Sequence, residues 1–319
     1  MKKVDREDRK ITYKKSKFVP RFILLVSAVL VLALLTIFAY KIIHRHFYNT
    51  SSISLLYEKW NIYDYESVYK ISGNILEKKP LQNTARTFRG YSAFFLAVSQ
   101  NDNTSAQSYL DEAINNMRIA LLNCKAKTLG QLQYMLGKAY FYKDSMSSYY
   151  YYADLAVKYL KKSIDNNYKS NDISEYLGLS YAALGDTQNS IASFTEALLV
   201  RESDTLLLAI AEQYYKAGTG SAAKQYLNRV IDISQNEDII TRSHVLLGNI
   251  YLNENNYADS EKEFNTILEK NENSADAHYG LGVLYEKQEN LVKARSEWRK
   301  CLRIQVNHPG AIQKMAESK

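Results

Sequence analysis

The chain carries HVLLGNIYLNENNYADSEKEFNTILEKNENSADA at residues 244–277 and, directly after it, HYGLGVLYEKQENLVKARSEWRKCLRIQVNHPGA at residues 278–311. The two stretches align without a gap at an offset of 34 residues. The agreeing positions are His244 with His278, Leu247 with Leu281, Gly248 with Gly282, Tyr251 with Tyr285, Asn256 with Asn290, Glu263 with Glu297, Leu268 with Leu302, Asn273 with Asn307, and Ala277 with Ala311. A period of 34 residues is the length of a helix–turn–helix unit that buries its apolar face only by stacking on neighbouring units. The sequence therefore predicts an all-α solenoid.

A shared pattern of small and aromatic residues extends this repeat along the chain. Leu-Gly-x-x-Tyr is followed about nine residues later by Ala-x-x-x-Phe-x-x-Ala, with substitutions in each copy. This pattern resembles the tetratricopeptide repeat. In such a repeat the Leu-Gly pair lets the first helix, helix A, approach the second, helix B. The small residue that opens helix B allows a close crossing, and the aromatic residue after it fills the core. The resemblance implies a right-handed superhelix of paired helices.

About seven repeats are expected between residues 49 and 308. Their predicted bounds are 49–82, 83–129, 130–170, 171–203, 204–240, 241–274 and 275–308. A capping helix and tail follow at 309–319, with the helix at 311–317, because the last unit of a solenoid needs a polar cap. Gly185 and Gly218 are placed to end A helices, and Asn256 and Asn290 to cap B helices.

The third repeat departs from the pattern because its helix B starts seven residues late. The surplus includes four consecutive tyrosines at residues 149–152. Successive helical residues are rotated by about 100°, so these rings do not all face one core. We expect some of them to be exposed, and Tyr149 and Tyr150 are then candidates for contact with a partner. The alternative is that the insertion folds back and covers the neighbouring repeat.

The run FILLVSAVLVLALLTIFAY at residues 22–40 holds no charged residue. With two further isoleucines after Lys41, it predicts a transmembrane anchor helix at 22–43. A cleaved signal peptide is the alternative. Nine Lys/Arg precede the run, which predicts a basic cytoplasmic tail at 1–21 and repeats outside the cytoplasm. A short linker at 44–48 is expected between the anchor and the first repeat. The expected protein is a single-pass protein of the inner or cytoplasmic membrane.

Charge and motifs exclude several function classes. The net charge is +7, but the excess lies before residue 46, so no basic face extends along the repeats to bind nucleic acid. No catalytic or phosphate-binding motif is present, so we expect neither an enzyme nor a cofactor nor a small-molecule substrate. His244 and His278 face the same way in adjacent repeats. They form either a metal pair or, as we favour, part of the packing.

The resemblance implies that the A helices line a concave groove that binds a peptide or a partner helix. The family's subset that grips chaperone tails needs clustered Lys and Asn on successive A helices, and this chain lacks that cluster. By helical phase the groove-facing candidates are Tyr134, Lys138, Phe141, Tyr142, Glu212, Tyr215, Lys216, Arg242, Asn249, Tyr279, Glu286 and Lys287.

The sequence therefore predicts a membrane-tethered scaffold or adaptor that binds a partner protein or peptide in the groove. One alternative is a periplasmic chaperone associated with secretion or envelope assembly, which would bind many unfolded clients weakly. Others are an enzyme accessory or unrecognised enzyme, and a topology that places the repeats in the cytoplasm. Neither the partner nor the oligomeric state follows from the sequence.

Overall fold

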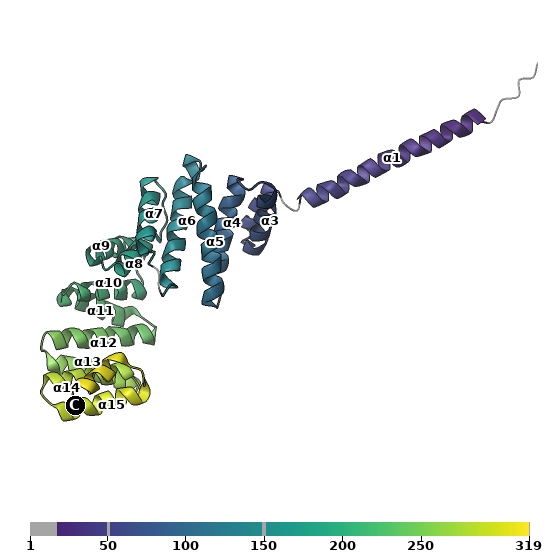
Figure 1. Ribbon diagram of the computed structural model, residues 1–319. Helices are drawn as coiled ribbons and strands as arrows, with labels where there is room; N and C mark the ends of the chain where they lie inside the picture. Colours follow the sequence, from purple (N-terminus) through teal and green to yellow (C-terminus); the bar gives the residue numbers. More distant parts are fainter. Residues whose placement is uncertain (1–17, 50–51, 149–150, 319) are drawn as a thin grey trace, which may run out of the picture. The chain divides into compact units, whose positions relative to one another are not determined.

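The computed structural model describes residues 18–49, 52–148 and 151–318. Within these ranges every regular element is an α-helix, numbered α1 to α16 in chain order (Figure 1). The predicted all-α class is thereby confirmed for the described part of the chain. Most of the predicted cytoplasmic tail, together with Tyr149 and Tyr150, lies outside the described residues.

The chain divides between Phe88 and Arg89 into two compact bodies. The N-terminal body contains α1 (Phe18–Asn49), α2 (Ile53–Asn61), α3 (Tyr65–Lys78) and the first residues of α4 (Asn83–Val98). Its core joins α2, α3 and the start of α4 through Leu56, Val68, Ile71, Ile75, Ala85 and Phe88. The carboxylate of Asp64 accepts a hydrogen bond from the Ser67 amide and so caps α3.

The predicted membrane anchor falls in α1. The side chains that the structure describes there are Ser27 and those of residues 29–43. No helix in the described part of the chain combines the length and the apolar character that a bilayer crossing requires. This finding overturns the transmembrane helix predicted at 22–43 and the membrane localisation deduced from it.

The C-terminal body holds the rest of α4 and all later helices. They are α5 (Asn103–Leu121), α6 (Ala126–Ser145), α7 (Ala153–Asp165), α8 (Ile173–Ala183), α9 (Thr187–Leu198), α10 (Asp204–Lys216), α11 (Gly220–Ile233), α12 (Glu237–Asn253), α13 (Tyr257–Lys270), α14 (Ala275–Lys287), α15 (Leu291–Ile304) and α16 (Pro309–Glu317). From α5 onward each helix packs against the next one in the chain. The helices follow one another in series (Figure 1) and do not surround one common centre. This arrangement is the solenoid that the repeat predicts.

The small residues of the repeat pattern allow helix A and helix B to pack closely. A Cβ atom added at Gly248 would lie 2.6 Å from Cζ of Phe264, which is fully buried. Gly282 has the same relation to Trp298 one repeat later. The Ser260 hydroxyl donates a 2.9 Å hydrogen bond to the Gly248 carbonyl, which ties the start of α13 to α12. Close packing of this kind fixes the angle between the paired helices.

The predicted helix ends are also confirmed. Gly185 and Gly218 have φ of +73° and +74°, a conformation that favours glycine after a helix. The side chains of Asn256 and Asn290 accept hydrogen bonds from backbone amides in the first turns of α13 and α15. At the C-terminal end, α16 buries Ala311 against α15, and His308 caps it by accepting the Ala311 amide at 3.1 Å.

Candidate functional site

The face formed by the A helices is the candidate site. The A helices are α4, α6, α8, α10, α12 and α14, and the B helices are α5, α7, α9, α11, α13 and α15. Besides its own helix B, α6 contacts α8, α10 contacts α12, and α12 contacts α14. The helices α6 and α8 therefore lie side by side, as do α10, α12 and α14, and the side chains of each group make a surface across adjacent repeats.

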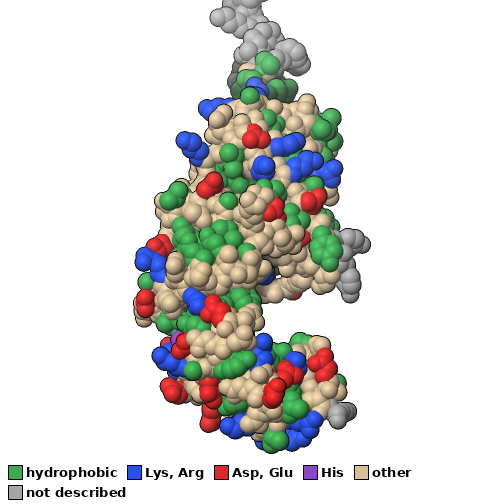
Figure 2. Space-filling view, turned by 90° about the vertical axis from the view of Figure 1, so that its left-hand side faces the viewer, with side chains coloured by type: hydrophobic (Ala, Val, Ile, Leu, Met, Phe, Trp, Pro, Cys, Tyr) green, Lys and Arg blue, Asp and Glu red, His purple; other side chains and the backbone are tan. Residues whose placement is uncertain are grey.

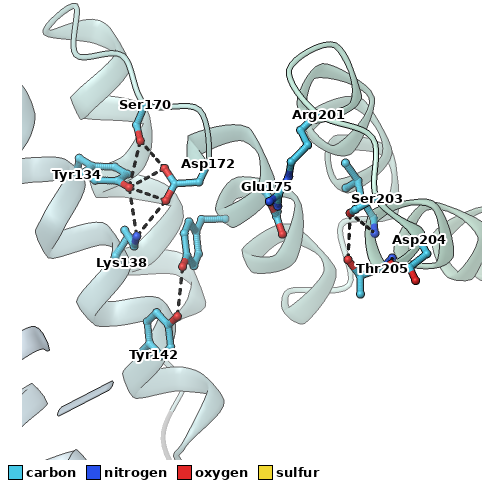
Figure 3. Close-up of polar contacts among 12 residues, drawn as sticks. Tyr134, Lys138, Tyr142, Ser170, Asp172, Glu175, Arg201, Ser203, Asp204 and Thr205 are labelled. Atoms are coloured by element: carbon cyan, nitrogen blue, oxygen red, sulfur yellow. Dashed lines mark hydrogen bonds and ion pairs between the residues drawn. The ribbon is translucent and has the colours of Figure 1, made fainter. Parts of the chain in front are cut away.

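A polar cluster joins α6 to the start of α8 (Figure 3). The hydroxyl of Tyr134 donates to the two carboxylate oxygens of Asp172, at 2.6 and 2.7 Å. The ammonium of Lys138 lies 3.0 Å from Asp172 Oδ2 and 3.2 Å from the Tyr134 hydroxyl. Ser170 donates a further hydrogen bond to Asp172. Asp172 therefore accepts hydrogen bonds from three side chains, two of them on the preceding A helix.

The cluster holds its groups in defined charge states. Burial disfavours the charge on Lys138, but the hydrogen bonds to Asp172 and Tyr134 and the electrostatic attraction of these two groups together outweigh this effect and raise the pKa of the ammonium. Burial likewise acts against the Asp172 carboxylate, but hydrogen bonds from Ser170, Tyr134 and Lys138 lower its pKa. Burial, together with the hydrogen bond to Asp172, raises the pKa of Tyr134 to about 12. At neutral pH the cluster is therefore an ion pair with a neutral tyrosine.

Five aromatic rings lie beside this cluster, and we call them the aromatic surface: Phe94, Phe95, Phe141, Tyr142 and Tyr176. The ring of Phe94 lies 5.5 Å from that of Tyr142, and Phe141 lies 5.1 Å from Tyr176, both edge to face. The hydroxyls of Tyr142 and Tyr176 are 3.2 Å apart and share a hydrogen bond. Phe94 is buried, and the other four rings are partly exposed. The rings form a continuous patch across α4, α6 and α8.

The Lys138 ammonium links the ion pair to the aromatic surface. It lies 4.6 Å from the centroid of the Tyr176 ring and 5.2 Å from that of Tyr134. Ring faces attract a cation at these distances. The side chain of Lys138 is 16% exposed, so little of this charge reaches solvent.

The sequence identified Tyr134, Lys138, Phe141 and Tyr142 as candidates but not Phe94 and Phe95 of α4. It also did not identify Asp172 and Tyr176. Asp172 and Tyr176 each lie 34 residues after a partner, Asp172 after Lys138 and Tyr176 after Tyr142. Because the third repeat holds seven extra residues, equivalent positions of α6 and α8 lie 41 residues apart, as Gly137 and Gly178 do. These pairs therefore join non-equivalent positions, and the period gave no signal for them. The structure also buries Tyr134, of which 6% is exposed.

A second group of candidates lies on α10 and α12. The carboxylate of Glu212 forms a 2.6 Å ion pair with Arg242, and the hydroxyl of Tyr215 accepts a 3.3 Å hydrogen bond from Asn253. A cavity of about 200 Å³ adjoins the ion pair and is lined by Glu212, Thr241, Arg242, Val245, Leu246 and Asp276. Its lining comes from three successive A helices, α10, α12 and α14.

The last candidates differ in how free they are. Tyr279 packs against the His308 ring, with centroids 4.7 Å apart, and Glu286 forms a 2.8 Å ion pair with Lys314 of α16. These two residues therefore hold the terminal helix. Lys216 and Lys287 are exposed, and Asn249 is partly exposed.

Of the four consecutive tyrosines, the structure describes two, one of which is exposed while the other packs against α6. Tyr151 is 89% exposed, whereas the Tyr152 ring stacks on Tyr140 of α6, with centroids 6.2 Å apart. The carboxylate of Asp144 accepts the amides of Tyr152 and Ala153, at 2.6 and 3.1 Å, and so fixes the start of α7.

The two repeated histidines contact carboxylates of their own repeats. Nδ1 of His244 lies 2.6 Å from Glu263, and Nδ1 of His278 lies 2.7 Å from Glu297. Each pair joins helix A to helix B at the same position of the repeat, which is the packing role that we favoured. The described residues include no group of three His, Cys, Asp or Glu side chains arranged to hold a metal ion.

Comparison with known proteins agrees with this architecture. A family model of the tetratricopeptide repeat matches residues 153–206 and 245–311. These residues form α7 to the start of α10 and most of α12 to the start of α16. These two stretches therefore match the tetratricopeptide repeat. No curated protein compared with the chain matches it.

Solved structures share the fold at low sequence identity. The C-terminal part of a tetratricopeptide-repeat protein from Cytophaga hutchinsonii is 13% identical with a TM-score of 0.57, over 82% of this chain and 98% of that one. The Cut9–Hcn1 assembly of the APC/C is 14% identical with a TM-score of 0.50, over 82% of this chain and 48% of that one. YrrB, described as a protein with an unusual peptide-binding site, is 19% identical with a TM-score of 0.47, over 63% of this chain and 97% of that one.

Proposed function

We propose that the C-terminal body is a scaffold or adaptor that binds a partner protein, or a peptide segment of it, along the A-helix face. The observation that carries this proposal is the aromatic surface on α4, α6 and α8. Its rings are held by edge-to-face contacts and by the shared hydrogen bond of Tyr142 and Tyr176. Preorganised aromatic side chains offer a large contact area and lose little conformational entropy on binding.

Four charged side chains of this face, Lys138, Glu212, Arg242 and Glu286, are paired within the protein, whereas Lys216 and Lys287 are exposed. These pairs are Lys138 with Asp172, Glu212 with Arg242, and Glu286 with Lys314. The side chain of Lys138 is 16% exposed, so a ligand that used this charge would have to break its pair with Asp172, at a cost in desolvation. We therefore expect the contacting part of the partner to be mainly apolar, with backbone carbonyls that accept hydrogen bonds from the tyrosine hydroxyls.

The cavity beside Glu212 and Arg242 extends the proposed surface to α10, α12 and α14. Its volume of about 200 Å³ accommodates one side chain of a bound segment. An extended segment that contacts both the aromatic surface and this cavity would span several repeats. The repeat fold suits such binding because each repeat depends only on its neighbours for its core.

Photo-crosslinking tests this proposal. p-Benzoylphenylalanine is placed at Tyr142 and at Lys216 on the A-helix face, and at Lys161 as a control on the exposed side of helix B in the third repeat. We expect one discrete crosslinked product from the two A-helix positions and none from Lys161. Equal crosslinking at Lys161, or a diffuse set of products from every position, contradicts a specific scaffold.

Substitution of the aromatic surface gives an independent measurement. Phe141→Ala with Tyr142→Phe removes one ring and one hydroxyl, both at partly exposed positions. We expect loss of the discrete product from Lys216 with retention of the helical circular dichroism. An unchanged product would show that the partner binds elsewhere.

A further inference from the structure

Helix α15 carries an excess of positive charge that the rest of the solenoid does not balance locally. Its fourteen residues include five basic side chains and one acidic side chain. The preceding B helix, α13, has the opposite balance, with four acidic and two basic side chains. The excess on α15 is therefore a feature of this repeat and not of the repeat pattern.

Three of the five basic side chains of α15 have partners. Lys300 lies 2.6 Å from Glu297, Arg295 donates to the Ser318 carbonyl, and Lys293 lies over the Tyr285 ring. Arg299 and Arg303 are exposed, and no described acidic side chain lies within ion-pair distance of either. Two guanidinium groups are thus available to a ligand.

These two arginines lie on one face of α15, four residues apart and therefore one turn from each other. With Ser296 and Leu302 they line an open hollow of about 440 Å³, and we call these four residues the α15 arginine surface. Val306, 79% exposed, follows at the end of the helix. Figure 2 shows basic side chains beside hydrophobic ones along the lower edge of the C-terminal body.

The surface is separate from the A-helix face. The opposite side of α15 buries Ala294, Trp298 and Cys301 in the core of the last repeat. The arginines therefore point away from the core that α15 shares with α14 and α16. A ligand bound to them leaves the aromatic surface free.

We propose that the α15 arginine surface binds an acidic segment of a partner protein, with Asp or Glu side chains next to apolar ones. A guanidinium group binds a carboxylate through two parallel hydrogen bonds, and two such groups one turn apart fit two carboxylates of one segment. Leu302 and Val306 supply the apolar contacts. Nucleic acid fits less well, because two free cations do not make a basic track along the repeats.

Fluorescence anisotropy of the full chain with a short fluorescein-labelled peptide of Glu and Leu residues tests this proposal. The variant Arg299→Glu/Arg303→Glu is expected to weaken binding about tenfold or more. The matched control is Lys161→Glu/Lys162→Glu, which makes the same charge change at two exposed positions of α7. We expect the control to change binding by less than about twofold. Equal losses in the two variants would overturn the proposal, because they would show attraction to net charge alone.

Two further measurements separate the chemistry from its alternatives. Arg299→Lys/Arg303→Lys retains the charge but loses the paired hydrogen bonds, and we expect binding about threefold to tenfold weaker than in the wild type. The same peptide with Gln in place of Glu is expected to bind at least about tenfold more weakly than the Glu peptide. Unchanged binding of either would refute recognition of carboxylates by these arginines.

Competition with an oligonucleotide tests nucleic acid as the occupant of this surface, and sedimentation tests a second copy of the chain. A single-stranded oligonucleotide that displaces the peptide at lower concentration than unlabelled Glu peptide does would overturn the assignment to a protein segment. A dimer of this chain that dissociates in Arg299→Glu/Arg303→Glu would also overturn the assignment, because a second copy of the chain would then occupy this surface. Discrete crosslinking from Tyr142 is expected to persist in this variant, which distinguishes a failure of this site from a failure of the proposed groove.

Discussion

Removing the Asp172 carboxylate is the sharpest test of how α6 and α8 are held together. In Asp172→Ala the Tyr134 hydroxyl, the Ser170 hydroxyl and the Lys138 ammonium lose their shared acceptor. A hydrogen bond to a charged group contributes ~1.5–3 kcal/mol when it is buried. The Asp172 side chain is 35% exposed, so water replaces part of this interaction. We therefore expect a loss of ~2 kcal/mol in the free energy of opening at this junction.

A double-mutant cycle with Lys138→Met isolates the pair. Met keeps most of the side-chain volume but removes the charge, so Asp172 retains two donors and the single substitution costs ~1 kcal/mol. Once Asp172 is absent, removing a half-buried cation is expected to cost almost nothing. The predicted coupling is therefore ~1 kcal/mol. Hydrogen exchange of the backbone amides of α6 and α8, analysed by mass spectrometry, reports the free energy of local opening.

The same cycle has a defined pH dependence. The folded state lowers the pKa of Asp172, so its contribution is present above the usual carboxyl pKa of 3.8 and is lost as pH falls through the folded value. The folded state raises the pKa of Lys138, so its contribution is present below 10.5 and is lost as pH rises through the folded value. We expect the coupling to be constant across the neutral range.

The control is an exposed pair at another junction. Arg229 and Glu202 lie 2.7 Å apart, but their side chains are 59% and 40% exposed. Arg229→Met with Glu202→Ala is expected to show no measurable coupling, because water screens an exposed pair. Additive effects at Asp172 and Lys138, or equal coupling in the control, would refute the reasoning.

Three further predictions concern the repeats themselves. Phe264→Ala is expected to lower the free energy of unfolding by ~3–5 kcal/mol, because the ring is fully buried against Gly248 and Gly280. Urea unfolding followed by circular dichroism measures this loss. A loss no larger than that of an exposed Leu→Ala change would contradict the packing. Gly218→Ala is expected to cost ~1 kcal/mol in the same assay, because its φ is +74°, and a stabilised variant would argue against the left-handed helix end. Maleimide is expected to label Cys124 well before Cys301 at pH 8, because Cys301 is 0% exposed and burial raises its thiol pKa to about 11. Mass spectrometry measures the two labelling rates, and equal rates would show that the last repeat is open.

The helices and their ends depend on residues close together in the chain, so the sequence predicts them directly. Gly248 and Phe264 define a crossing within one repeat, and Asn256 and Gly218 mark helix ends through backbone geometry within a few residues. Each of these signals involves residues of a single hairpin. Because the same hairpin recurs every 34 residues, the alignment of residues 244–277 with 278–311 was enough to predict the all-α solenoid.

The candidate site was only half predictable, because it forms between repeats. Helical phase identified Tyr134, Lys138 and Tyr142 on α6, but their partners Asp172 and Tyr176 belong to the next repeat. The phase of a helix shows which side chains leave the core; it does not show which of them find partners on the adjacent helix. That depends on the stacking angle, which many weak contacts set together.

The sequence by itself determined the helices, their order and the small and large residues that pack each pair. Only the tertiary structure decided that Tyr134 is buried, that the groove charges at Lys138, Glu212 and Arg242 are paired within the protein, and that Arg299 and Arg303 lie exposed on one face of α15. It also overturned the anchor predicted from an apolar run. The physical reason is range: hydrogen-bond caps and helix period act over a few residues, whereas charge pairing and burial depend on neighbours that the chain brings together only when the repeats stack.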